Sequence, residues 1–203
     1  MFLDFPQIPT MPKVTVIPGA YYATKDVCVI STLLGSCVAA CLWDPVAKIA
    51  GMNHFLLANR RYARDMPLTG TEAGRYGVQS MEILINAMIH LGADKRRIRA
   101  KAFGGGKVLE TLGKDNFNCV GSVNERFIRE FLATEGIPLD SDDLGGDLGR
   151  VIRFRTDTYA VYRRFVKKTS TYLVEREELG FWKKSIKRQR EEEEAQKKKE
   201  ILF

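Results

Sequence analysis

Hydrophobic and polar residues alternate along several short stretches of the chain, and a period of two predicts β-strands. "KVTVI" at residues 13–17 and "DVCVISTLL" at residues 26–34 are rich in β-branched residues, which favour strands. "RIRAKAF" at residues 97–103 places an apolar side chain at every second position. "VIRFRTDTYAVYRRF" at residues 151–165 has the pattern of two further strands around a "TDT" turn. We therefore expect strands early and late in the segment from residue 13 to residue 165.

Two longer patterns lie between these strands. "CVAACLW" at residues 37–43 and "IAGMNHFLL" at residues 49–57 are joined by "DPVAK", in which Asp-Pro starts a turn, so they predict a buried hairpin. Apolar residues then recur at helical spacing over residues 76–91, and again after a capping-box pattern formed by Ser122 and Glu125. This order predicts the α/β (α+β) class: a mixed or antiparallel sheet sandwich with helices packed on one side.

The periodic pattern fades after residue 165, which suggests three segments. We expect an N-terminal arm at residues 1–13, a single folded domain at residues 14–165 and a charged tail at residues 166–203. The tail includes "KKSIKRQREEEEAQKKKE", a composition typical of a solvated, partly helical or disordered segment. On this pattern alone we expect no defined binding role for it.

Charge and composition narrow the function. The formal net charge is +7, but the last 23 residues hold eight Lys or Arg against five Glu, so the remainder is only mildly basic. Basic clusters are not interleaved with stacking aromatic residues, so an acidic protein partner is favoured over nucleic acid. The longest uncharged run, residues 27–43, is shorter than a membrane span. The N-terminus has no signal-peptide pattern, so we expect a cytoplasmic protein without membrane insertion.

Candidate chemistry centres on Cys37 and His54. If Pro45 and Val46 form a two-residue turn, Cys37 lies directly opposite His54 on one face of the hairpin. A shift of two residues leaves the pair diagonal on that face, whereas a shift of one separates them. The thiol follows two small residues in "GSC", where the main-chain N–H groups of Ser36 and Cys37 could stabilise an oxyanion.

The residues alone leave a second interpretation open, in which Cys37 is an inert buried thiol. Cys28, Cys41 and Cys119 fit that interpretation, since a reducing compartment needs no disulfides. His90 suits the last turn of the first helix and is expected to be structural. No Cys-x-x-Cys or His-x-x-x-His spacing is present, so we expect no metal.

Several motifs together resemble one known family. "LGSCVAACLWDP" at residues 34–45 and "GMNHFLL" at residues 51–57 are similar to CheD, the chemoreceptor glutamine deamidases of bacterial chemotaxis. The resemblance continues through "YGVQSMEILINAMIHLGA", "RIRAKAFGGGKVL", "NERFIREFLATEGIPL" and "DLGGDLGRVIRF", and so covers residues 14–165. It implies a cysteine hydrolase on an α/β sandwich that converts receptor glutamine side chains to glutamate without a cofactor.

The resemblance also implies roles for individual residues. Cys37 is the nucleophile and His54 the general base, while a count without gaps places the third catalytic residue on Ser31, with Thr32 beside it. Asn53 is a further candidate for orienting the base or binding the oxyanion. Four arginines around the loop after His54 are candidate receptor contacts: Arg60, Arg61, Arg64 and Arg75.

The implied partners are methyl-accepting chemotaxis receptors as substrate and a CheC-type phosphatase. Three alternatives stay open from the sequence: a cysteine-dependent receptor glutamyl methylesterase or amidase, a non-catalytic regulator that binds receptor or phosphatase, and nucleic-acid binding by the basic tail.

Overall fold

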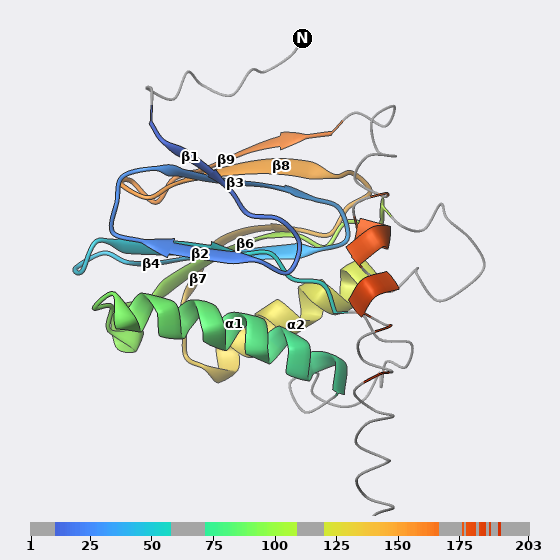
Figure 1. Ribbon diagram of the computed structural model, residues 1–203, viewed down its shortest axis with the longest axis horizontal. Coiled ribbons are helices and arrows are strands. Elements are labelled where there is room, and N and C mark those ends of the chain that lie inside the picture. Colours follow the sequence, from blue (N-terminus) through green and yellow to red (C-terminus); the bar gives the residue numbers. More distant parts are fainter. Residues whose placement is uncertain are drawn as a thin grey trace, which may run out of the picture.

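The computed structural model describes residues 11–57, 72–108 and 120–166, and individual positions between 176 and 191. Two β-sheets pack face to face, and the two long helices of the described body, at residues 72–90 and 120–134, lie on the outer face of one sheet (Figure 1). The predicted α+β sandwich with helices on one side is therefore confirmed. Among the residues described, no helix combines the length and apolar composition that a membrane crossing requires.

The outer sheet has four strands and the helix-covered sheet has five. The first runs in the order β1 (Lys13–Thr15), β3 (Val29–Leu34), β8 (Arg150–Arg155) and β9 (Val161–Phe165). The second runs in the order β2 (Tyr21–Thr24), β5 (Ile49–Asn53), β4 (Val38–Asp44), β6 (Arg99–Gly104) and β7 (Leu139–Leu144). The described body also contains α1 (Glu72–His90), α2 (Val120–Thr134) and a short 3-10 helix at Lys95–Arg97.

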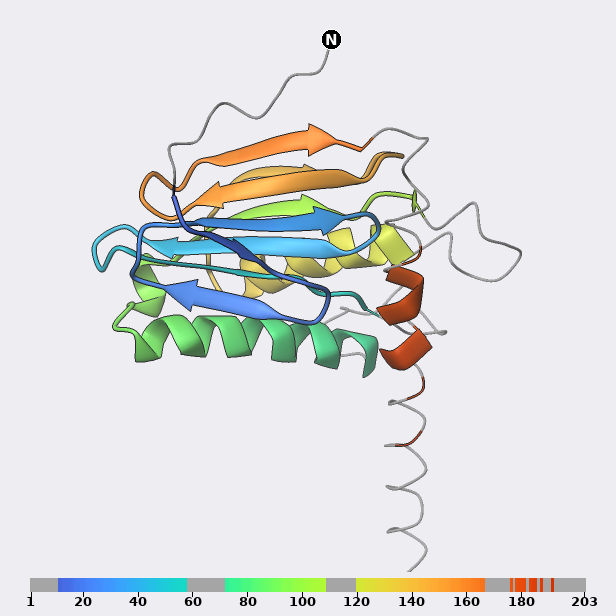
Figure 2. The ribbon, with the colours of Figure 1, turned by 45° about the horizontal axis from the view of Figure 1, so that its top comes forward.

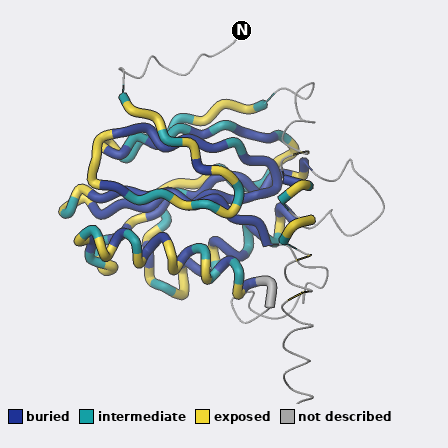
Figure 3. Tube along the Cα trace, in the orientation of Figure 1, coloured by how far each residue is buried: buried dark blue, intermediate teal, exposed yellow. Residues whose placement is uncertain are grey.

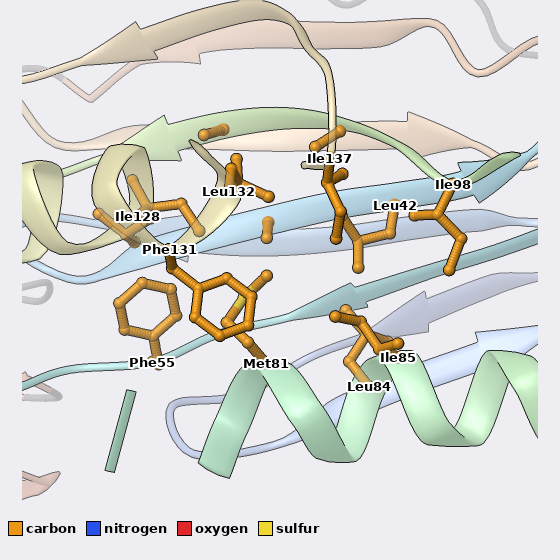
Figure 4. Packing of buried hydrophobic residues seen from close by; sticks show 14 of the residues in the cluster. Leu42, Phe55, Met81, Leu84, Ile85, Ile98, Ile128, Phe131, Leu132 and Ile137 are labelled. Atoms are coloured by element: carbon orange, nitrogen blue, oxygen red, sulfur yellow. The ribbon is translucent and has the colours of Figure 1, made fainter. Parts of the chain in front are cut away.

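Strand β4 is buried on both faces, which explains why its sequence is apolar throughout (Figure 3). Leu42 and two neighbours at alternate positions face α1 and α2, where they join the core seen in Figure 4. Ala39, Cys41 and Trp43 point the other way, into the space between the two sheets. Cys37 belongs to this second set. The alternation of β4 therefore places the thiol between the sheets, away from the helices.

The hairpin turn differs from the prediction. Asp44 pairs with Ile49, so the loop has four residues instead of the expected pair Pro45 and Val46. The Asp44 carboxylate accepts hydrogen bonds from the main-chain N–H groups of Val46 and Ala47, and Lys48 has a φ of 53°. An aspartate that caps its own turn stabilises this longer loop. The register is thereby shifted by two, and Cys37 and His54 become diagonal neighbours on the same face.

Two other details were missed by the sequence pattern. Strand β7, with the sequence "LDSDDL", is polar, and its Asp140 and Asp142 form ion pairs with Arg99 and Arg129. Helix α2 includes Ser122 in its first turn, so the predicted capping box was wrong. That turn lies against a glycine loop, where a Cβ on Gly121 would be only 2.5 Å from the Gly105 carbonyl oxygen.

Candidate active site

The short loop between β3 and β4 presents three consecutive main-chain N–H groups to one point. The groups of Gly35, Ser36 and Cys37 donate to the carboxylate of Glu178 over 2.7, 2.8 and 3.0 Å, and the Ser36 hydroxyl donates over 2.6 Å. We call this loop, residues 35–37, the amide cradle. Successive N–H groups that converge in this way form an anion-binding concavity.

Glu178 reaches the amide cradle from the tail. It belongs to the helical segment described at positions between 176 and 191, coloured orange-red in Figures 1 and 2. In both views this segment lies at the edge of the molecule where β3 turns into β4. The Glu178 residue is 1% exposed. At this position the tail is therefore buried against the body and is not a solvated segment.

His54 follows β5 directly and is held by Thr32 on β3. The Thr32 hydroxyl lies 2.8 Å from Nδ1 of His54 and donates to the carbonyl oxygen of Val16 at 2.6 Å. Because the hydroxyl has one proton, which goes to Val16, it accepts the hydrogen bond from Nδ1–H of His54. The other ring nitrogen, Nε2, is then unprotonated in the neutral imidazole. It is buried and has no hydrogen-bond partner among the described residues.

The thiol, the imidazole and the carboxylate form one compact group. Sγ of Cys37, a ring nitrogen of His54 and a carboxylate oxygen of Glu178 all lie within 4.8 Å of one another, and all three residues are buried. The sequence prediction that Cys37 and His54 share a face is therefore met in the structure. This proximity results from a diagonal placement across the hairpin.

Burial keeps both groups of the pair neutral, and the Glu178 carboxylate adds to this effect only at the thiol. Burial raises the pKa of the Cys37 thiol well above its usual value, and the charge and hydrogen bonding of Glu178 raise it further. Burial also lowers the pKa of His54 to about 4, while Glu178 acts in the opposite direction. At neutral pH the pair therefore consists of a thiol and a neutral imidazole.

Two predicted site residues have other partners. The Ser31 hydroxyl donates to the Ile152 carbonyl oxygen at 3.0 Å, because neighbouring residues of β3 point to opposite faces. The structure therefore brings Thr32, and not Ser31, to His54. Asn53 points away from the amide cradle toward α1, where its side chain accepts from Ala40 N–H and donates to the hydroxyl of Ser80. The prediction of an oxyanion-binding Asn53 was wrong.

A buried asparagine that the sequence pattern did not indicate supports the site. Asn124 on α2 donates to the Ser36 carbonyl oxygen and accepts from the N–H of Leu57, both over 2.8 Å. It thereby ties the amide cradle to the segment that follows His54. The available signal was a polar residue within "SVNERFI", next to the apolar face of a predicted helix.

The remaining candidates lie outside this group. Of the four arginines, Arg75 is exposed on α1, while Arg60, Arg61 and Arg64 fall outside the described residues. Cys28 and Cys41 are buried free thiols, and burial raises the pKa of each. Cys119 also falls outside the described residues. His90 is exposed, with Nδ1 2.7 Å from the carbonyl oxygen of Asn86 in the last turn of α1.

Cys37, His54 and Glu178 are also residue types that bind zinc. Each carboxylate oxygen of Glu178, however, already accepts two hydrogen bonds in the amide cradle. The arrangement is thus committed to anion binding. A thiol, an imidazole with an unprotonated Nε2 and convergent N–H donors are the groups that cysteine-dependent acyl transfer requires.

Comparison with known proteins places the chain in a family. The CheD family, described as "CheD chemotactic sensory transduction", matches residues 56–165. A protein of Geobacter sulfurreducens named "Probable chemoreceptor glutamine deamidase CheD 1" is 52% identical over 85% of this chain and 87% of its own. The chain belongs to the CheD family.

Other relatives bear similar names. "Probable chemoreceptor glutamine deamidase CheD 2" of Shewanella oneidensis is 47% identical over 74% of this chain and 75% of its own. A "Probable chemoreceptor glutamine deamidase CheD" of Rhizobium leguminosarum bv. trifolii is 48% identical over 70% of this chain and 73% of its own. Cys37 and His54 lie before residues 56–165, the part of the chain that the CheD family matches.

Proposed function

We propose that this chain is a protein-glutamine deamidase that converts glutamine side chains of chemotaxis receptors to glutamate. Its membership of the CheD family and the names of its relatives support the substrate class. One observation carries the chemistry: a glutamate side chain, the product of such a reaction, is held by the amide cradle beside Cys37 and His54. We assign the activity to the domain at residues 14–165.

The proposed reaction begins with proton transfer. Nε2 of His54 takes the proton of the Cys37 thiol, while Thr32 holds the ring through Nδ1–H and so keeps Nε2 available. A neutral glutamine side chain in the amide cradle, in place of Glu178, removes the negative charge that disfavours the thiolate. Binding of the amide substrate therefore favours formation of the nucleophile.

The thiolate then attacks Cδ of the glutamine, and a bond forms between Sγ and Cδ. The amide oxygen becomes an oxyanion that accepts from the amide cradle, where each lost donor typically costs about 2.7–4 kcal/mol of barrier. The C–N bond breaks, ammonia leaves with the proton from His54, and a thioester remains. Water, deprotonated by His54, attacks the thioester; the Sγ–Cδ bond breaks and the thiol regains its proton.

We propose chemoreceptors as the partner and the cytoplasm as the location, since the reaction needs a free thiol and a reducing compartment maintains one. Arg75, exposed on α1, is a proposed contact for acidic receptor surface. A CheC-type phosphatase stays a proposed second partner. Co-purification of the two proteins, with a Cys37→Ala variant included to separate binding from turnover, tests that interaction.

The function is tested by incubating the protein with a chemoreceptor cytoplasmic fragment and mapping its peptides by mass spectrometry. We expect specific glutamines to become glutamates with wild-type protein and to stay unchanged with Cys37→Ala. Methanol release from a methylated fragment without any conversion of glutamine would instead indicate a methylesterase. Binding without either reaction would indicate a non-catalytic regulator.

A further inference from the structure

The amide cradle in this structure is complementary to a carboxylate. Oε1 of Glu178 accepts from the N–H groups of Gly35 and Cys37, and Oε2 accepts from the N–H and hydroxyl of Ser36. All four groups of the amide cradle donate hydrogen bonds, and an ionised carboxylate only accepts them. A carboxamide in the same position would place its NH2 group, which is a donor, against another donor: either the N–H of Ser36 or the N–H groups of Gly35 and Cys37. The observed geometry therefore suits the product of deamidation better than the substrate.

We propose that Glu178 is a product-like ligand that the chain supplies to its own active site, and that the tail segment carrying it keeps the site closed until a receptor segment displaces it. The term "product-like" rests on the proposed deamidase function. The closure itself does not, because it follows from the atoms that occupy the amide cradle next to the thiol. Cys37 is 0% exposed with Glu178 in place.

The tail contacts the body at a second residue, Phe181, and this contact helps to position Glu178. The Phe181 ring packs against the core between the sheets and lies over Gly19, where a Cβ would be 2.6 Å from the ring. Glu178 and Phe181 are three residues apart on a helix, so both face the body of the protein. A substrate helix could occupy the same two positions with a glutamine and an apolar residue.

The tail segment does not pack completely against the body, so a receptor segment can displace it. A cavity of about 370 Å³ remains between the tail and the body, lined among others by Tyr21, Leu56 and Lys184. No ion pair between Glu178 and a Lys or Arg is present within the described part of the chain. Lys183, Lys184 and Lys187 of the tail are exposed. Phe181 is only partly buried, so the tail can leave the site by giving up this one contact with the core between the sheets.

The closure is tested by the rate at which iodoacetamide alkylates Cys37 in the full-length protein, followed by peptide mass spectrometry. We expect Glu178→Ala to raise this rate by at least about tenfold, because reactivity scales with the populated fraction of the open state. Phe181→Ala should give a smaller increase. Glu191→Ala, which removes an exposed carboxylate of the same tail, should match wild type.

Equal alkylation rates in wild type, Glu178→Ala and Phe181→Ala would overturn the proposal. The assay needs no receptor, so its outcome is independent of deamidase activity. Faster alkylation without deamidation of receptor fragments by any variant would leave the closure standing and reject the proposed function. Receptor deamidation with unchanged alkylation would do the reverse.

A glutamine placed at position 178 tests the product-like geometry directly. In Glu178→Gln we expect Cys37 to hydrolyse the introduced side-chain amide, so that the purified protein contains glutamate at position 178 and the released nitrogen leaves as ammonia. Cys37→Ala combined with Glu178→Gln should retain the glutamine, as should a control glutamine introduced at Glu191. An intact amide at position 178, in a protein that deamidates receptor fragments, would show that the tail does not occupy the site as product does.

Discussion

Asp44 and Glu178 are both buried carboxylates that accept main-chain hydrogen bonds, but different groups balance their charges. Asp44 accepts from its own hairpin loop and from the N–H of Asp94, and it forms a bidentate pair with the Arg97 guanidinium. These contacts hold the pKa of Asp44 well below its usual range. Glu178 has hydrogen-bond donors but no Lys or Arg partner among the described residues, and its donors lie more than 140 residues away in sequence.

Because of this difference, Asp44 belongs to the fold, whereas Glu178 behaves as a ligand of the site. A buried carboxylate with a cation and local donors cannot leave without breaking the structure around it. A buried carboxylate beside a thiol and an imidazole, supplied by a distant tail, can be exchanged for another side chain. The Asp44 cluster is thus expected to govern stability and the Glu178 cluster to govern activity.

The largest expected effect is on turnover at the Glu178 cluster. His54→Gln removes the base that takes the Cys37 proton, and general acid–base catalysis contributes about 10²–10⁴-fold in rate. We expect a loss of that size in receptor deamidation, measured by mass spectrometry, with the fold retained by circular dichroism. A variant with near wild-type turnover would contradict the role of His54.

Next in size is the effect of Asp44→Ala on stability. Removal of Asp44 leaves Arg97 and several loop N–H groups without their acceptor, and breaking a buried pair typically costs about 3–5 kcal/mol. We expect urea unfolding to show a loss near the lower end, since Arg97 is partly exposed. Asp140→Ala, at a surface pair with Arg99, should cost less than about 1 kcal/mol.

Glu178→Ala should resemble the surface control in unfolding experiments. If it destabilised the protein as much as Asp44→Ala, Glu178 would belong to the fold, and the distinction between the two carboxylates would be lost.

The pH dependence of stability separates the two clusters further. The folded pKa of His54 is about 4, below its usual value of 6.5, so the unfolded chain binds more protons between these values. Stability should therefore fall as the pH drops from about 6.5 to about 4, by at most about 3 kcal/mol. In His54→Gln, the midpoint of urea unfolding should change less with pH over this range.

Asp44 should contribute to acid unfolding at lower pH. Its folded pKa is depressed, so its stabilisation is present above its usual pKa and is lost as the pH falls below that value. A fall between pH 6.5 and 4 that persisted unchanged in His54→Gln would show that another group is responsible.

The smallest effect distinguishes Thr32 from Ser31. Thr32→Val removes the acceptor of His54 Nδ1–H. A lost hydrogen bond of this kind costs about 1–3 kcal/mol, or roughly fivefold to 150-fold in rate if it acts on the base, and we expect the lower end of this range. Thr32→Ser should restore activity, whereas Ser31→Ala should leave it unchanged. Equal losses in Thr32→Val and Ser31→Ala would show that the ring is not held through Thr32.

The sequence predicted the Cys37–His54 pair because a two-residue change of register keeps both side chains on one face. The same sequence did not predict the four-residue loop, since Asp44 caps its turn through contacts that hydrophobic patterning does not encode. Ser31 shows the opposite sensitivity: a count that is wrong by one residue moves the predicted hydroxyl to the other face of β3. Strand β7 was missed because its sequence does not alternate between apolar and polar residues. Its aspartates pair with arginines of neighbouring elements instead.

Glu178 was the least predictable part of the site. More than 140 residues separate it from the amide cradle, and the tail composition is typical of a solvated helix. The one hint is "ELGFW" at residues 178–182, an apolar group within a charge-dense segment. Only the folded chain shows that this group brings a carboxylate to the thiol.

In the proposed reaction, Cys37 forms a thioester with the glutamine side chain, and water hydrolyses this thioester to glutamate. The most direct measurement is deamidation of a chemoreceptor fragment in water enriched in heavy oxygen, with each modified peptide mapped by mass spectrometry. We expect glutamates that carry one heavy oxygen with wild-type protein and unmodified glutamines with Cys37→Ala. Equal deamidation of the same glutamines by Cys37→Ala would contradict the claim.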